Sequence, residues 1–63
     1  MKLKDIRVAQ GLTQSELAKL ADVPRSSIAN VESGKRRADG LSGAILLKLA
    51  DALDCDMRDL IDD

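Results

Sequence analysis

The chain has 63 residues, no histidine and no aromatic residue, one cysteine and a formal net charge of −1. We expect one domain over residues 1–63, near the lower size limit for folding without a metal ion or disulfides. No disulfide framework, metal cluster or Ser/His or Cys/His catalytic pair can form, so we expect a non-enzyme without metal or cofactor. No apolar run reaches the roughly 18 to 20 residues that cross a bilayer, and no signal peptide is visible, which predicts a cytoplasmic protein without a membrane partner.

Two short helices are predicted at the start of the chain. Apolar spacing places the first over about Lys2 to Gln10, and Gly11 ends it. Thr13 and Glu16 then form a capping box, in which each side chain bonds the backbone N–H of the other residue. The second helix is therefore expected to begin at Gln14.

A third helix, from about Arg25 to Ser33, is expected after a turn at Val23 and Pro24. Proline suits the first turn of a helix because its missing N–H costs nothing there. Gly34 is expected to end this helix as a left-handed cap.

The third helix has two chemically different faces. At about 100° per residue, Ile28 and Val31 share one face, which is expected to pack inward. The opposite face holds polar and small residues that suit hydrogen bonds to base edges and contact with a thymine methyl group: Arg25, Ser26, Ala29, Asn30 and Ser33. An ordinary solvated helix face is equally polar, so this pattern alone leaves both interpretations open.

Charge is divided unevenly along the chain. Residues 1–37 carry eight Lys/Arg against four Asp/Glu, a net +4, whereas residues 38–63 carry two against seven, a net −5, and the two sum to −1. The basic half includes the third helix and the run Lys35, Arg36 and Arg37, so one side of the molecule is expected to approach a polyanion. A solvated loop is the alternative interpretation of that run.

Two more helices are expected in the second half, after a connection over residues 38–43 that is rich in turn-forming residues. Residues 44–53 have a broad apolar face. Asp56 can cap a short last helix over residues 57–61. The fold class expected is all-α, with five helices and no strand.

Aliphatic side chains must supply the whole core because the chain has no aromatic residue. The core residues expected are Leu3, Ile6, Leu17, Leu20, Val23, Ile28, Val31, Leu46, Leu49, Leu53 and Leu60. Cys55 lies between Asp54 and Asp56, whose charges raise the pKa of its thiol, so we expect a small core residue and not a redox site. Arg7 and Glu32 flank apolar faces that must meet, which predicts an ion pair between them.

Two segments carry a resemblance: Gly-Leu-Thr-Gln-Ser-Glu-Leu-Ala at residues 11–18 and Val-Glu-Ser-Gly-Lys at residues 31–35. With Ile28 between them, they resemble the phage-repressor (Xre-like, lambda-repressor-like) helix-turn-helix family, and residues 47–53 and 57–61 resemble its fourth and fifth helices. The resemblance implies a compact five-helix domain that binds DNA through helices 2 and 3, usually as a dimer on a two-fold symmetric operator.

Position by position, the resemblance implies a role for individual residues. Four match base-contacting positions: Arg25, Ser26, Ala29 and Asn30. Five are expected to contact phosphates, and the first of them also to brace the start of the recognition helix: Gln14, Ser33, Lys35, Arg36 and Arg37. Arg7 and Glu32 match a salt bridge that ties helix 1 to helix 3 in many members.

The sequence also departs from the family pattern. Asp22 and Asp54 stand where glycine is usual, at turn positions that often need positive φ, which Asp tolerates. Pro24 replaces the usual Ser or Thr, so the hydroxyl cap is lost. The connection from Lys35 to helix 4 is longer than is typical of the family, which puts the DNA contacts of this loop in question.

The function expected is that of a sequence-specific regulator of transcription, of the repressor type, that binds double-stranded DNA with its recognition helix in the major groove. Arg25 suits a bidentate contact to guanine, and Asn30 suits adenine. A homodimer through Leu47, Met57 and Ile61 would place two recognition helices about 34 Å apart, although these residues could instead complete the monomer core. The alternative function is a protein-interaction module, such as an antitoxin-like subunit whose acidic C-terminal half docks a protein partner.

Overall fold

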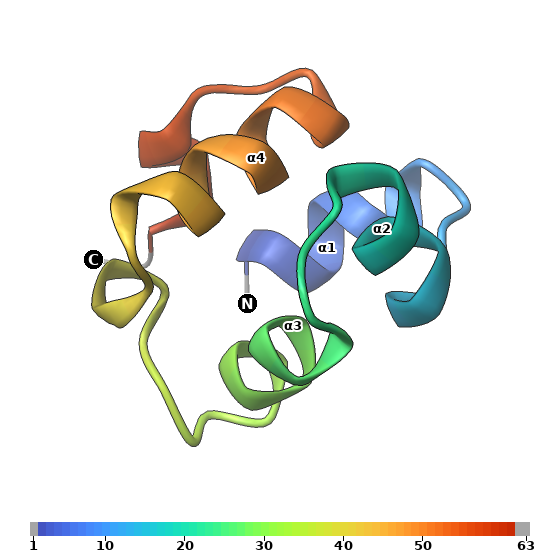
Figure 1. Ribbon diagram of the computed structural model, residues 1–63. Coiled ribbons are helices and arrows are strands. Elements are labelled where there is room, and N and C mark those ends of the chain that lie inside the picture. The colour runs from blue at the N-terminus through green and yellow to red at the C-terminus, as the bar shows by residue number, and fades with distance from the viewer. Residues whose placement is uncertain (1, 62–63) are drawn as a thin grey trace.

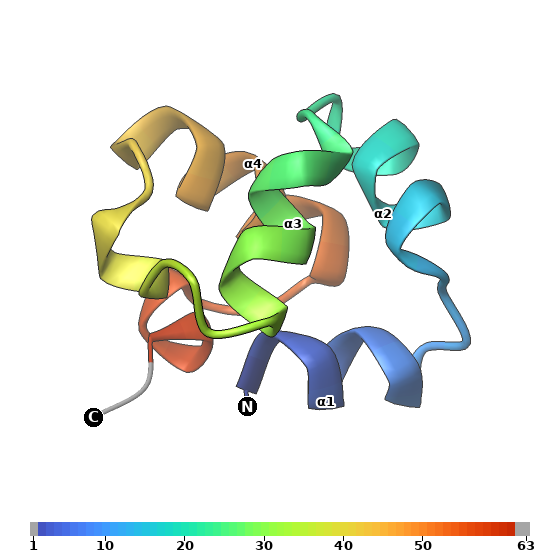
Figure 2. The same ribbon diagram turned by 90° about the horizontal axis from the view of Figure 1, so that it is seen from below.

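The computed structural model describes residues 2–61, which form four α-helices and two short 3₁₀ turns without any strand (Figure 1). The helices are α1 (Lys2–Ala9), α2 (Gln14–Ala21), α3 (Arg25–Glu32) and α4 (Gly43–Leu53). The turns are η1 (Ala38–Gly40) and η2 (Met57–Leu60). Helix α2 packs against both α3 and α4, while α1 packs against α3 and η2. Figure 2 shows α3 at the front of the molecule, with α1 below it and α2 to one side.

The all-α architecture is as expected, but the count of five helices is not confirmed. The segment predicted as the fifth helix is the 3₁₀ turn η2, held by bonds from Asp59 N to Asp56 O (3.0 Å) and from Ile61 N to Arg58 O (3.3 Å). The backbone becomes extended at Ile61, so the segment is too short for the bonds between residues i and i+4 of an α-helix. The connection before α4 contains a second such turn, η1.

Side chains and left-handed residues set the helix boundaries. Thr13 and Glu16 form the expected capping box, with Glu16 N donating to Thr13 Oγ1 at 3.0 Å and Thr13 N donating to Glu16 Oε1 at 2.9 Å. Ser42 caps α4 by accepting from Ile45 N at 3.2 Å. The C-caps that follow α2 and α4 are Asp22 and Asp54, whose φ angles of 58° and 54° place both in the left-handed region.

The core consists of aliphatic side chains from every helix. Most residues expected there are buried, and Ile6 packs partly buried against them. Leu20 was a wrong prediction: its side chain is 60% exposed, because the inward face of α2 is already occupied by Leu17, Ala18 and Ala21. The connection before α4 adds two core residues that were not expected, Ala38 and Leu41.

None of the helices within residues 2–61 is both long and apolar enough to cross a membrane. The same residues contain no group of three or more Cys, Asp or Glu side chains placed to hold a metal ion. Cys55 lies partly buried against the core; burial and the nearby carboxylates of Asp59, Asp56 and Asp54 raise the pKa of its thiol.

Candidate nucleic-acid interface

A tight turn joins α2 to α3 and sets the direction of α3. Asp22 adopts the left-handed conformation, and Val23 N donates to Ala18 O at 3.0 Å, which closes the end of α2. Val23 is buried, so the turn is fixed to the core. Pro24 is the N-cap of α3 and provides no side-chain cap, as expected from the missing hydroxyl. The first turn of α3 therefore has no side-chain cap on its backbone N–H groups.

Packing holds α3 by one face and leaves the other accessible. Ile28 and Val31 are almost completely buried, with exposed fractions of 0% and 1%. The five residues assigned to the opposite face remain accessible to different degrees. Arg25, Ser26 and Ser33 are exposed, and Ala29 and Asn30 are half-buried. The four residues expected to contact bases are thus exposed or half-buried. They belong to α3, the helix at the front of the molecule in Figure 2.

The end of α3 is bonded to the segment that follows it. The backbone carbonyl of Asn30 accepts from Ser33 Oγ at 3.2 Å and from Arg36 N at 3.1 Å. In this arrangement the Ser33 hydroxyl gives its hydrogen to Asn30, whereas a phosphate oxygen can only accept. The predicted phosphate contact of Ser33 therefore requires its hydroxyl to rotate away from Asn30.

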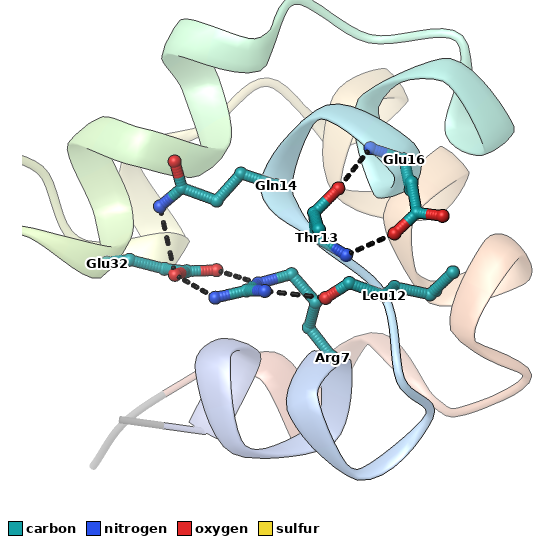
Figure 3. A network of polar contacts seen from close by, with 6 residues as sticks. All are labelled: Arg7, Leu12, Thr13, Gln14, Glu16 and Glu32. Atoms are coloured by element: carbon teal, nitrogen blue, oxygen red, sulfur yellow. Dashed lines mark hydrogen bonds and ion pairs between the residues drawn. The ribbon is translucent and has the colours of Figure 1, made fainter.

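A buried ion pair joins α3 to α1, between Arg7 and Glu32 (Figure 3). Arg7 donates from Nε to Glu32 Oε2 at 2.7 Å and from Nη2 to Glu32 Oε1 at 2.8 Å, a bidentate contact. Its Nη1 donates to the backbone carbonyl of Leu12 at 2.6 Å. The two charged side chains are only 10% and 5% exposed. The pair thus lies inside the domain, where it positions α3 and does not face a ligand.

Gln14 extends this network to α2, because its Nε2 donates to Glu32 Oε1 at 3.1 Å (Figure 3). The resemblance implied that Gln14 braces the start of the recognition helix, but in the structure it contacts the last residue of that helix. A side-chain amide has two N–H donors, and Glu32 accepts only one of them. The second donor of Gln14 can still serve the predicted phosphate contact.

Both members of the ion pair are held in their charged forms. Burial raises the pKa of Glu32, but hydrogen bonds from Arg7 and Gln14, together with the charges of Arg7 and Lys4, outweigh burial and leave the pKa below its ordinary value. The hydrogen bond to Glu32 raises the pKa of Arg7, although burial opposes it. Among residues 2–61, no buried side-chain nitrogen or oxygen lacks a hydrogen-bond partner.

The three basic residues that follow α3 closely in the sequence are exposed. Lys35, Arg36 and Arg37 are all exposed, and Arg37 is the N-cap of η1. Arg37 Nε forms an ion pair with Asp39 Oδ1 at 3.2 Å. The ion pair between Arg37 and Asp39 was not predicted from the sequence, although their spacing of two residues in a turn segment was a weak signal for it.

The three residues expected at a dimer interface differ in exposure. Leu47 on α4 and Met57 in η2 are exposed, whereas Ile61 packs partly buried against the core. A shallow hollow at this surface is lined by Met57 and Ile61 together with Leu46, Asp56 and Arg58. Leu47 and Met57 thus have apolar surface that the core does not use.

Comparisons with known proteins agree with this arrangement. The helix-turn-helix family matches residues 3–60 of the chain. Among solved structures, a similar one is the restriction-modification controller protein C.AhdI from Aeromonas hydrophila. It has 42% sequence identity and a TM-score of 0.80, over 95% of this chain and 86% of that chain. The search of curated proteins finds no match. A family match across nearly all of the chain, on the fold and helix pair described above, shows that the chain belongs to the phage-repressor-like (Xre-like) helix-turn-helix family of DNA-binding transcription regulators.

Proposed function

We propose that the chain binds a specific double-stranded DNA sequence by placing α3 in the major groove, and that this binding represses transcription. The observation that carries the proposal is the accessible face of α3, where Arg25, Ser26 and Asn30 lie on a helix held by buried contacts on its other side. Hydrogen bonds from such side chains to base edges specify sequence, while contacts to phosphates position the helix. Binding, and not catalysis, is the proposed activity.

Roles are proposed for individual residues by their positions. Arg25 would donate to O6 and N7 of a guanine, and Asn30 would bond an adenine edge. Ser26 would reach a base edge or a phosphate, and Ala29 would contact a thymine methyl group. Phosphate contacts are proposed for the flanking donors: Gln14, Ser33, Lys35, Arg36 and Arg37.

We also propose that two copies bind together, through Leu47, Met57 and Ile61. Exposed apolar side chains on α4 and η2 support this, since apolar surface gains free energy when another copy covers it. A two-fold pair would place its two α3 helices about 34 Å apart, one turn of DNA. Sedimentation of the free chain and of its complex with operator DNA measures this, and a monomer in both samples would contradict it.

The similarity to a restriction-modification controller supports a narrower form of the proposal. At 42% identity over 95% of the chain, the neighbour suggests that this chain controls transcription of genes of a restriction-modification system. Such control could include activation as well as repression. A reporter gene placed behind the DNA sequence that the chain binds distinguishes the two, because a repressor lowers and an activator raises its expression.

The experiment that tests DNA binding is selection of bound duplexes from a random pool. We expect one enriched sequence with two-fold symmetry, and an affinity that falls steeply with salt because phosphate contacts release counterions. Enrichment of no sequence, together with affinity that is independent of salt, would contradict the proposal. That result would favour the second function, a module whose acidic C-terminal half binds a basic protein partner.

A further inference from the structure

The segment from Lys35 to Leu41 follows the recognition helix and is fixed at both ends. Arg36 N donates to Asn30 O at 3.1 Å, which ties its start to α3. Ala38 and Leu41 are buried in the core, and Leu41 N donates to Ala38 O at 3.1 Å. The backbone of this loop is therefore held at both ends, by α3 and by the core.

Within this loop Arg37 already has an anionic partner. Its Nε lies 3.2 Å from Asp39 Oδ1, and the side chains are 74% and 47% exposed. Asp39 is the one acidic residue between Lys35 and Leu41. The bond to Asp39 uses the Nε donor of Arg37, one of several N–H donors of the guanidinium group. Because a carboxylate and a phosphate repel each other and are both attracted to a guanidinium group, the Asp39 carboxylate weakens a phosphate contact made by Arg37.

We propose that Asp39 is a positioning residue that holds Arg37 in the free protein and competes with DNA phosphates for it. This inference rests on the proposed DNA-binding function and deepens it. Attraction to Asp39 draws the Arg37 side chain away from a phosphate, so the phosphate contact forms only in part. Arg37 therefore contributes little to the salt dependence while Asp39 is present.

Removing the carboxylate should release Arg37 for DNA. We expect Asp39→Asn to bind operator and random duplexes about two- to five-fold more tightly, the range typical of an exposed ion pair. The plot of log affinity against log salt should steepen by up to about one unit, because the phosphate contact of Arg37 then forms completely. Asp39→Glu, which keeps the charge, should bind like the unmodified chain.

Two comparisons separate this competition from a general effect of charge. Asp51→Asn makes the same charge change at an exposed position on α4, and should alter affinity and salt dependence less than Asp39→Asn. Asp39→Asn should also have a much smaller effect in a chain that carries Arg37→Gln, because the two residues act through each other. Thermal unfolding of each variant verifies that the fold is retained.

The results separate a failure of the role proposed for Asp39 from a failure of DNA binding itself, on which that role rests. If the unmodified chain binds neither duplex, the proposed function fails, and the inference fails with it. If the chain binds DNA but Asp39→Asn matches Asp51→Asn, the inference alone is overturned. An effect of Asp39→Asn that persists undiminished beside Arg37→Gln would also overturn it, since Asp39 would then act by its charge and not through Arg37.

Discussion

The side chain of Gln14 in the first turn of α2 donates to Glu32 at the end of α3, with Nε2 lying 3.1 Å from Oε1 (Figure 3). The same carboxylate accepts two bonds from Arg7 of α1. One acidic side chain thus joins three helices, two of which form the proposed DNA-binding unit. The orientation of α3 relative to its neighbours therefore depends on a charge that water hardly reaches.

Removing Glu32 alone should cost more stability than removing the whole ion pair. Glu32→Ala leaves the buried guanidinium of Arg7 without its partner, so we expect a loss of about 3 to 5 kcal/mol in the free energy of unfolding. The double variant Arg7→Met/Glu32→Leu buries no unpaired charge and should lie closer to the unmodified chain. Urea unfolding measures both. As a control, Asp39→Ala breaks an exposed ion pair and should cost at most about 1 kcal/mol. A double variant less stable than Glu32→Ala would contradict this account.

Glu32 should also contribute to the loss of stability in acid. The pKa of its carboxyl is lower in the folded protein than its ordinary value of 4.5, so the unfolded chain binds the proton more tightly. The stabilisation is complete above about pH 4.5 and is lost as pH falls through the lower, folded-state value. Arg7 does not titrate in this range. Urea unfolding from pH 3 to pH 7 should give Glu32→Gln a shallower decline than the unmodified chain, and parallel declines would refute the assignment.

Two leucines of α2 should respond differently to truncation. Leu17 is completely buried and Leu20 is 60% exposed, although they lie three residues apart. Leu17→Ala should therefore cost about 2 to 5 kcal/mol, through lost burial and the cavity left behind. Leu20→Ala is the matched control and should change stability by less than about 0.5 kcal/mol. Thermal unfolding compares the two variants. Equal losses of stability would mean that the Leu20 side chain is buried in solution.

Glycine should suit the turn at Asp22 better than aspartate does. Asp22 has a φ of 58°, which glycine adopts without steric cost. We expect Asp22→Gly to raise the free energy of unfolding by up to about 1 kcal/mol. The same change at Asp51, inside α4, should instead destabilise the chain slightly, by about 0.3 kcal/mol. A lower melting temperature for Asp22→Gly would show that the Asp22 side chain has a role beyond its backbone conformation.

Arg25 and Arg36 should separate sequence specificity from general affinity. Arg36→Ala removes one proposed phosphate contact, so binding to every sequence should weaken alike and the salt slope should decrease by about one unit. Arg25→Ala removes a proposed base contact, which should cost roughly 1 to 3 kcal/mol on the operator and relax discrimination at one base position per half-site. Both variants are measured on operator and random DNA at the same salt concentration. An equal loss for Arg25→Ala on both duplexes would contradict its assignment to a base.

Local chemistry was enough to predict most helix boundaries. The capping box at Thr13 and Glu16 places the start of α2 at Gln14, because it satisfies backbone N–H donors that have no partner within the helix. The positive φ at Asp22 likewise follows from a turn that only a few residue types tolerate. These features depend on neighbours in sequence, and so the sequence alone was sufficient for them.

The tertiary structure decided what depends on neighbours distant in sequence. Helical periodicity could not tell that Leu20 lies outside the core, because the available inward space depends on which helices pack against α2. The last segment became a 3₁₀ turn because only a few residues lie between Asp56 and the extended backbone at Ile61. Gln14 is separated from Glu32 by 18 residues, and periodicity places each residue on its own helix without giving the distance between the helices. Only the packing of α2 against α3 brings that amide and carboxylate within bonding distance.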